Sequence, residues 1–417
     1  MAKKDYDWSA GAELDEHSKR KHKILREYLR EYLITRCQLP QQEKFRLAIV
    51  DGFSGAGKYK CGSPGSPLIL LDSLKNTVQE INLDRTVQGM KLIEVECLLI
   101  FNDLAPSAIE ILKENVVPLV AEAKDTCPQL HVKIEFSHST FKEAYPEIKS
   151  KIQLGKYRNV LFNLDQCGYS DVDLGIIKDI LFTWKSAEVF LNFPIETVKT
   201  FISPDRNKSS ALKSHQKIRD DIYAELAKNG GLLSKADWLG EVERIVFENL
   251  KGCAPYASPF SIHNPDGWRY WLIHFANNYR ARQVYNNILH ENSTMQAHFG
   301  RSGLHMLSYD PSKEGELYLF NDNSRENAKK QLFEDIPRLI NEHGDVLSVE
   351  SFYEAAYNET PAHSNDIHEM IISNPDLEVI TPAGNERRKA NTIRPEDTLR
   401  LKRQTSFFPR FFDEDLK

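Results

Sequence analysis

The sequence predicts an α/β fold of the Rossmann-like kind, a mainly parallel sheet with helices on both faces, plus a C-terminal winged-helix-like α+β domain. Short apolar strands alternate with helical segments up to about residue 290, which is the pattern of a parallel sheet covered on both faces. Polar residues and glycines follow several of these strands, and such positions meet at one edge of the sheet. Beyond about residue 327, three helical segments precede a basic hairpin.

Composition limits the class of protein before any motif is considered. The chain has 417 residues, 41% hydrophobic and 27% charged, which is typical of a globular protein with more than one domain. A net charge of −6 gives no global nucleic-acid signal. None of the six cysteines form a CxxC pair, so we expect no metal site. No apolar run approaches a membrane span, and the N-terminus lacks a signal core, so we expect a cytoplasmic protein.

The N-terminal part is expected to be a loose leader over residues 1–17, followed by an amphipathic helix from Ser18. Apolar residues recur there at helical spacing. The first turns carry a basic run, residues 19–23. Two interpretations stay open for this run: a solvated helix face, or a phosphate contact beside the glycine-rich loop described below.

The expected Rossmann-like domain extends over residues 18–310. Its strands and helices alternate, and 204–252 should be mainly helical. The predicted strands are 45–50, 96–101, 131–136, 159–164, 187–193 and 269–276, with helices beginning near 67, 106, 141, 173 and 281. Proline is tolerated in the first turn of a helix, which favours helix starts at Pro67 and Pro106.

Residues 311–328 are polar and acidic and are expected to be a linker, leaving 329–417 as the winged-helix-like domain. Three helices, at 331–343, 349–357 and 364–374, precede extended segments at 377–381 and 398–402. Basic residues between those extended segments are candidates for contact with DNA or RNA phosphates: Arg387, Arg388, Lys389 and Arg394. Neighbouring acidic residues dilute this charge, so protein docking or dimerisation through the same module remains an alternative.

The segment Asp51–Tyr59 directly follows the first strand and is the main candidate for a ligand site. Gly52 to Lys58 fits the P-loop pattern G-x-x-x-x-G-K. A P-loop needs Ser or Thr next, to ligate magnesium, and here the residue is Tyr59. The following prolines and glycines also disfavour the helix start that cradles phosphate. A P-loop-like nucleotide binder is therefore the less favoured interpretation.

S-adenosylmethionine fits this loop better, because it has no phosphates and needs close backbone approach, which glycine permits. In this hypothesis Asp51 holds the ammonium group of the methionine part, and glycines of the loop allow the approach. The loop residues assigned to cofactor binding are Asp51, Gly52, Phe53, Gly55 and Gly57.

Later strand ends supply further polar groups in the order that this hypothesis requires. Asn102 and Asp103 follow the second strand, where an acid takes ribose hydroxyls in dinucleotide folds. Ser139 follows the third strand and can reach the adenine side. Asp165 follows the fourth strand, and its alternative role is to cap the next turn. Asp103 could likewise be a helix cap.

These motifs carry a resemblance to a known family. Asp51-Gly-Phe-Ser-Gly-Ala-Gly-Lys-Tyr, followed by Gly65-Ser-Pro, resembles the hallmark of the three-Cys-motif partner proteins. Lys21–Leu29 and Arg269–Asn277 resemble that family's opening helix and late strand. The family resembles class I S-adenosylmethionine-dependent methyltransferases. The resemblance implies that the protein acts beside a partner carrying a three-cysteine motif.

The resemblance also implies an Asp-Pro-aromatic-Gly motif after the fourth strand, where the acid and a backbone carbonyl hold an acceptor amine. Here Gln166 replaces the proline and Cys167 takes the aromatic position. The catalytic candidates are Asp165, Gln166, Gly168 and Tyr169. This departure leaves two functions open: methylation or binding of nucleic acid, and a non-catalytic adaptor on a methyltransferase fold. His138 and His274 are expected to be packed or surface histidines.

Overall fold

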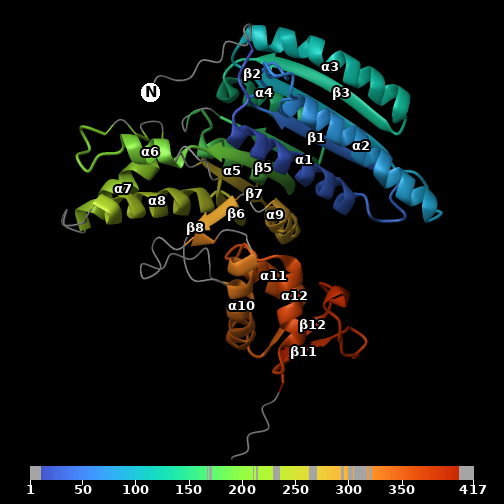
Figure 1. Ribbon diagram of the computed structural model, residues 1–417, viewed down its shortest axis with the longest axis vertical. Helices are drawn as coiled ribbons and strands as arrows, with labels where there is room; N and C mark the ends of the chain where they lie inside the picture. Colours follow the sequence, from blue (N-terminus) through green and yellow to red (C-terminus); the bar gives the residue numbers. More distant parts are fainter. Residues whose placement is uncertain are drawn as a thin grey trace, which may run out of the picture. The chain divides into compact units, whose positions relative to one another are not determined.

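The structure is a computed structural model that describes residues 11–166, 168, 171–209, 211–212, 215–228, 235–262, 270–292, 295–298, 304, 317–318 and 322–402. The chain forms two compact units, Met1–His298 and Phe299–Lys417, and each is described by itself (Figure 1).

The first unit is built on a mixed, mainly parallel sheet. Its strands lie in the order β3-β2-β1-β4-β5-β7-β6-β8. Strands β1 to β5 are parallel, whereas β7 runs antiparallel to both β5 and β6. The bounds are β1 Lys44–Asp51, β2 Glu94–Asp103, β3 Leu130–His138, β4 Asn159–Leu164, β5 Ser186–Phe193, β6 Tyr256–Ile262, β7 Tyr270–Ala276 and β8 Met295–His298.

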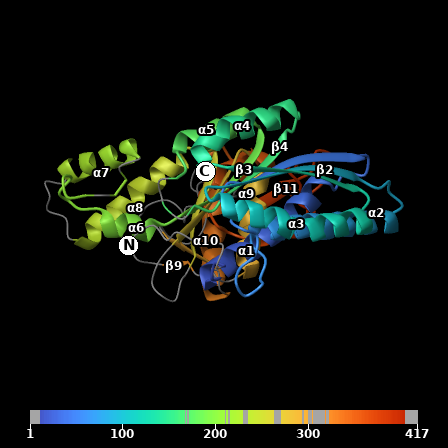
Figure 2. The same ribbon diagram turned by 90° about the horizontal axis from the view of Figure 1, so that it is seen from above.

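Helices cover both faces of the parallel strands, as the alternating pattern predicted. Figure 2 shows α4 and α5 on one side of the strands, and α1, α2 and α3 on the other. The bounds are α1 Glu16–Arg36, α2 Ser66–Val87, α3 Pro106–Thr126, α4 Phe141–Leu154, α5 Leu174–Thr183, α6 Ile195–Phe201, α7 Gln216–Lys228, α8 Lys235–Lys251 and α9 Tyr279–Asn292. The predicted α/β class is confirmed. Strands β6 and β8 were not predicted.

Helix α1 begins two residues earlier than expected, inside the predicted leader. The Asp15 side chain caps it by accepting a hydrogen bond from the Ser18 amide at 2.9 Å. The connection from α1 to β1 is held by Arg85, which is 4% exposed. Its guanidinium donates to five backbone carbonyls, those of Cys37, Leu39, Pro40, Gln42 and Lys91. These bonds fix the end of α1 against the sheet.

The second unit contains the predicted three helices and hairpin, with two additional strands, β9 and β10. Its elements are β9 Leu317–Tyr318, α10 Asp322–Glu342, β10 Val346–Ser348, α11 Val349–Ala356, α12 Ser364–Ser373, β11 Leu377–Ile380 and β12 Thr398–Leu401. Strand β12 lies between β10 and β11 and is antiparallel to both. Strand β10 was not predicted, and its residues pair with Thr398–Arg400 of β12. Helix α10 begins within the segment expected to be a linker.

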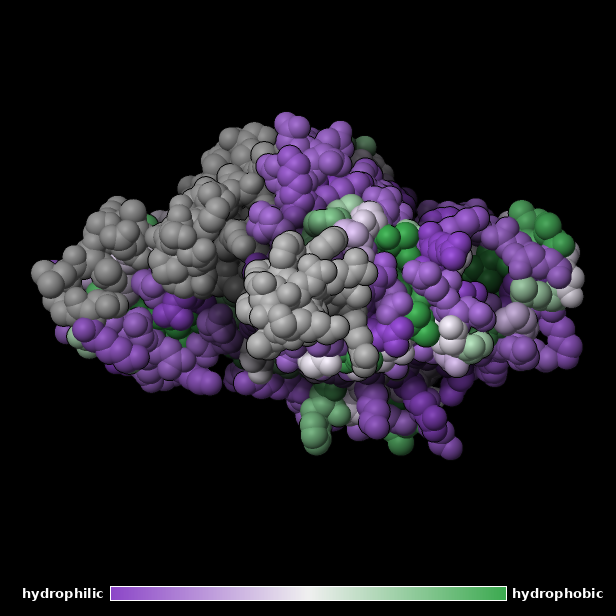
Figure 3. All heavy atoms as spheres, turned by 90° about the horizontal axis from the view of Figure 1, so that it is seen from below, coloured by the Kyte–Doolittle hydropathy of each residue, from purple (hydrophilic) through white to green (hydrophobic). Residues whose placement is uncertain are grey.

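The helices of the described residues reach 22 residues in length. No helix among them is both long enough and apolar enough to cross a bilayer. Figure 3 shows one face of the molecule, on which hydrophilic side chains surround smaller apolar areas.

Candidate functional site

Four strand ends bring polar side chains to one edge of the sheet in the first unit. Asp51 ends β1, and the parallel register places it beside Phe101 of β2 and Asn163 of β4. Asp103 ends β2, and Asn192 lies near the end of β5. Because the strands are parallel, their carboxyl ends form the crevice in which ligands bind in open α/β sheets.

The glycine-rich loop after β1 is fastened to the neighbouring strand ends. Ser54 donates its amide to the Asn102 carbonyl at 2.9 Å, and the Gly55 amide donates to Asp103 Oδ2 at 2.8 Å. The backbone has positive φ at Gly55 (57°) and Gly57 (80°). A Cβ on Gly57 would lie 2.6 Å from Leu112 Cδ1, so glycine is required there for packing as well.

This loop lacks the features of a phosphate cradle. Amides of the loop donate to carbonyl and carboxylate oxygens of the protein, as described for Ser54 and Gly55. Helix α2 begins at Ser66 rather than directly after Lys58, so no helix N-terminus meets the lysine. Lys58 itself is exposed. These observations agree with the interpretation that disfavoured a P-loop.

Asp51 is a buried carboxylate with spare capacity to accept hydrogen bonds. Its Oδ1 atom accepts from Phe53 N at 3.4 Å and from Asn163 Nδ2 at 3.3 Å. Its Oδ2 atom accepts no hydrogen bond of normal geometry within the described residues. An interaction with the Ser66 side chain lowers the pKa of Asp51 and so opposes part of the rise caused by burial. Burial raises the pKa of Asp51 to about 7, and the charge of Asp165 adds to the rise. An ammonium group would therefore find an acceptor here.

Asn102 joins two loops and is nearly fully buried. Its Nδ2 atom donates to the carbonyls of Gly52 and Ser139, both at 3.1 Å. Asp103 accepts from Ala105 N at 2.9 Å in the turn before α3. It is not the helix cap that one interpretation expected, because the N-cap is Ala105 and no side chain caps α3. A carboxylate offers about four acceptor positions. Asp103 therefore keeps capacity for ribose hydroxyls beside its two backbone bonds.

Ser139 and Phe53 border the same edge. Ser139 is half-buried, and its hydroxyl donates to the Thr140 carbonyl at 3.3 Å. Phe53 packs against Phe141 with ring centroids 6.0 Å apart. Gly52 is confined as well, because an added Cβ would lie 2.8 Å from both Phe141 and Leu164.

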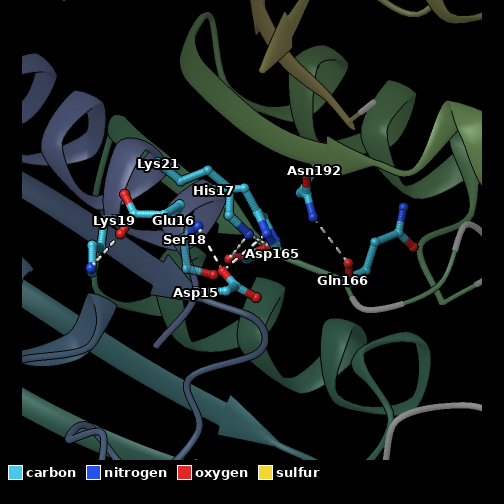
Figure 4. A network of polar contacts seen from close by, with 9 residues as sticks. All are labelled: Asp15, Glu16, His17, Ser18, Lys19, Lys21, Asp165, Gln166 and Asn192. Carbon is cyan, nitrogen blue, oxygen red and sulfur yellow. Dashed lines mark hydrogen bonds and ion pairs between the residues drawn. The ribbon is translucent and has the colours of Figure 1, made fainter. Parts of the chain in front are cut away.

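Asp165 is not free, because a lysine from α1 holds both of its oxygens (Figure 4). Lys21 Nζ lies 2.5 Å from Oδ1 and 2.6 Å from Oδ2. The Lys21 side chain is 9% exposed and the Asp165 side chain 27%. Lys21 was expected to belong to a solvated or phosphate-binding run. Its position four residues before Leu25 and seven before Tyr28, on the buried stripe of α1, was the signal available.

The Gln166 side chain is buried in the loop after β4 and accepts hydrogen bonds from its backbone. Its Oε1 atom accepts from the amides of Asp171 at 3.2 Å and Val172 at 3.1 Å. Its carbonyl accepts from Asn192 Nδ2 at 3.4 Å (Figure 4). The side chain is thus part of the scaffold of the loop. Gly168 belongs to the same loop, whereas the catalytic candidate Tyr169 lies outside the described residues, as does Cys167.

A cavity lies between α1 and the ends of β4 and β5. Its volume is about 20 Å³, which is room for about one water molecule. The Asn192 Oδ1 atom accepts no hydrogen bond from any described residue, although the side chain is buried. The cavity is lined by Lys21, His22, Ile24, Leu25, Ser66, Asn163, Asp165, Phe190, Asn192 and Leu272. Polar and apolar side chains both line it, but it is far smaller than the pockets that hold drug-sized ligands.

The residues before α1 and its first turns contact the glycine-rich loop and β7. The Ala12 carbonyl accepts from the Lys60 amide at 2.9 Å, which ties the segment to the glycine-rich loop. His17 stacks on Tyr270 with centroids 4.5 Å apart, and His22 contacts Tyr59 at 5.7 Å. Burial lowers the pKa of His22 to about 4, so this ring is neutral at pH 7.

His274 is packed in the core, as expected, in a polar cluster beneath the cavity. Its Nε2 atom lies 3.2 Å from Glu188 Oε2, to which the Tyr28 hydroxyl also donates. Burial lowers the pKa of His274. Phe190 contacts the rings of both Tyr28 and His274 and also lines the cavity. His138 lies at the surface.

The hairpin of the second unit divides its basic residues into two kinds. Arg387 forks onto the fully buried carboxylate of Asp397, with N–O distances of 3.0 and 3.2 Å. Arg388, Lys389 and Arg394 are exposed. Helix α12 carries no lysine or arginine. Exposed positive charge is therefore on the hairpin rather than on that helix.

Comparisons with known proteins cover the two units unequally. Residues 308–384 match the family model of the GMT-like wHTH domain, a winged helix-turn-helix. A search of curated proteins found no match. Loganic acid methyltransferase with SAH is a similar solved structure, with 8% identity and a TM-score of 0.24 over 68% of this chain and 85% of that chain. So low a TM-score supports no conclusion about function. The described residues contain no cluster with the composition of a metal site.

Proposed function

We propose that the first unit binds S-adenosylmethionine and acts as a methyltransferase. The observation that carries the proposal is Asp51, a buried carboxylate at the end of β1 with an oxygen left to accept from an ammonium group. It lies beside a glycine-rich loop that Asp103 fastens to β2. The residues present thus fit a ligand with an ammonium group at β1 and hydroxyls at β2.

The sheet supports this assignment. Its order β3-β2-β1-β4-β5 agrees with the dinucleotide-binding fold. The next strand, β7, runs antiparallel to β5 and lies between β5 and β6. In the proposed complex Asp51 and Gly52–Gly57 hold the methionine part, Asp103 the ribose, and Ser139 faces the adenine side.

The acceptor that we propose is a nucleic acid, bound through the winged-helix domain in the cytoplasm. Exposed Arg388, Lys389 and Arg394 supply the positive charge that phosphate contacts need. The motifs that resemble three-Cys-motif partner proteins support a protein partner of that kind.

Charge reversal on the hairpin tests this contact. We expect the double variant Arg388→Glu, Lys389→Glu to bind DNA or RNA about tenfold more weakly at low salt, with a smaller salt dependence. Fluorescence anisotropy over a range of salt concentrations measures both. Lys330→Glu, at an exposed position on α10, is the control for net charge. Arg387 is left intact because its change would leave Asp397 buried without a cation. Unchanged affinity and salt slope would reject the hairpin contact.

A second candidate function is a non-catalytic adaptor that keeps the cofactor as a structural ligand. The Lys21–Asp165 ion pair favours it, because it occupies the side chain expected to face an acceptor. Incubation with methyl-labelled S-adenosylmethionine and DNA, RNA or a three-Cys-motif protein separates the two. Label in one of these substrates supports the methyltransferase, whereas cofactor binding with no label in any of them supports the adaptor.

A further inference from the structure

We propose that Lys21 is itself a methyl acceptor, so that the protein methylates its own α1 helix. The inference rests on the proposed function and assigns a modification site. Its basis is the pairing of Lys21 Nζ with Asp165, the residue after β4 to which the resemblance described above implies a role in holding an acceptor amine.

The ion pair has the geometry of a held amine. Nζ lies within 2.6 Å of both Asp165 oxygens, so the carboxylate orients two of its N–H bonds. Lys21 is a buried side chain and not a mobile surface cation. Ile24, Leu25, Phe190 and Leu272 give the cavity an apolar wall suited to the four-carbon stem of a lysine.

Lys21 lines a cavity that shares Asn163 with the proposed cofactor site. Asn163 lines it and also donates to Asp51 Oδ1 at 3.3 Å. Asn192 lines it too, and its Oδ1 atom has no partner among the described residues. A buried carbonyl oxygen of this kind can accept a further N–H from an amine in the cavity. An amine held here therefore contacts Asp165 directly and is linked to Asp51 through Asn163, which lines the same cavity.

The other lysines of this region differ from Lys21. Lys19 is exposed and pairs with Glu16 one turn away, at 2.5 Å. Lys58 and Lys60 are exposed on the glycine-rich loop. Neither kind of position holds the nitrogen in a fixed direction. The structure therefore assigns modification to Lys21 and not to the accessible lysines nearby.

The transfer balances with groups already named. The Lys21 ammonium first gives a proton to Asp165, its hydrogen-bond partner. The freed lone pair on Nζ then bonds to the methyl carbon of the sulfonium cofactor. The bond from that carbon to sulfur breaks, and both electrons stay on sulfur. The products are Nζ-methyl-Lys21 and S-adenosylhomocysteine, and Asp165 passes its proton to water.

Mass spectrometry of the full chain after incubation with S-adenosylmethionine tests the assignment. We expect a mass gain of one or more methyl groups, mapped to Lys21 by peptide analysis of the wild-type protein. Lys21→Arg, which keeps the cation, should abolish the gain, and Lys19→Arg should leave it unchanged. Asp165→Asn should reduce it at least tenfold.

A second readout needs no turnover. In the absence of cofactor, an amine-acetylating reagent should modify Lys21 at least tenfold more slowly than Lys19, because burial and the ion pair protect it. Asp165→Asn should remove much of that protection.

Calorimetry and methyl mapping together distinguish failure of this inference from failure of the proposed function. If calorimetry shows that S-adenosylmethionine binds, but no methyl group appears on Lys21 or it appears on another lysine, the inference is wrong, and methyl label on DNA, RNA or a three-Cys-motif protein decides the proposed function separately. If S-adenosylmethionine does not bind at all, the proposed function fails. Equal acetylation of Lys21 and Lys19 would contradict the geometry on which the inference depends.

Discussion

Replacing Asp51 by asparagine is expected to weaken S-adenosylmethionine binding at pH 8 by about 100-fold or more, the usual cost of removing one partner of a buried charge pair. The substitution keeps the size of the side chain and removes the charge that the ammonium group needs. Isothermal titration calorimetry measures the change. Asp125→Asn, at an exposed position near the end of α3, is the matched control and should bind like the wild type.

The same substitution should change how binding depends on pH. The pKa of Asp51 is about 7 in the free protein, and the cation binds the ionised form. Affinity should therefore rise about tenfold per pH unit below 7 and become constant above about pH 8. Asp51→Asn should lose this rise.

Stability should depend on pH with the opposite sign. A carboxyl whose pKa is raised on folding binds more protons in the folded state, so its contribution to stability is present below its ordinary pKa of 3.8 and is lost as the pH rises through 7. Without ligand, Asp51→Asn should be more stable than the wild type at pH 8 in urea denaturation.

If Asp51→Asn bound S-adenosylmethionine at pH 8 with an affinity within threefold of the wild type, that result would contradict the role of Asp51 in holding the ammonium group.

Replacing Gly57 by alanine is expected to lower the free energy of unfolding by about 2–4 kcal/mol. Its φ of 80° is strained for alanine, and the new Cβ would lie 2.6 Å from Leu112 Cδ1. Gly62 is the matched control, since its φ is 82° and an added Cβ would meet nothing within 4 Å. Gly62→Ala should cost about 1–2 kcal/mol from the backbone alone.

The difference between the two alanine variants isolates the contact with Leu112. Urea denaturation gives both free energies, and calorimetry should show a larger loss of cofactor affinity for Gly57→Ala, because that loop is displaced. If Gly57→Ala and Gly62→Ala lost equal free energy of unfolding, the Leu112 side chain would be able to move away from the new methyl group without destabilising the protein. The loop would then be less tightly packed than its geometry indicates.

The parallel half of the sheet was predictable because β1, β2 and β4 are apolar runs that end at polar residues. The direction of β7 was not, since the alternation of side chains is the same in parallel and antiparallel strands. Strand β6 was missed because Tyr256–Ile262 contains a proline and two serines, residues that are unusual within strands.

The site was predictable to the level of the strand ends and no further. Asp51, Asp103 and Asp165 follow their strands in the sequence, and parallel strands bring such residues to one edge. The pairing of Asp165 with Lys21 joins residues 144 positions apart, and no local pattern reports such a contact. Arg387 is a second example. Nothing in the sequence distinguishes it from the basic residues beside it, and only the fold pairs it with Asp397.

Calorimetry with S-adenosylmethionine and, separately, with ATP and magnesium tests the central claim most directly. The buried Asp51 carboxylate, the loop amides that donate within the protein and the start of α2 at Ser66 predict binding of S-adenosylmethionine and none of ATP. Binding of ATP with magnesium, and no binding of S-adenosylmethionine, would contradict the claim.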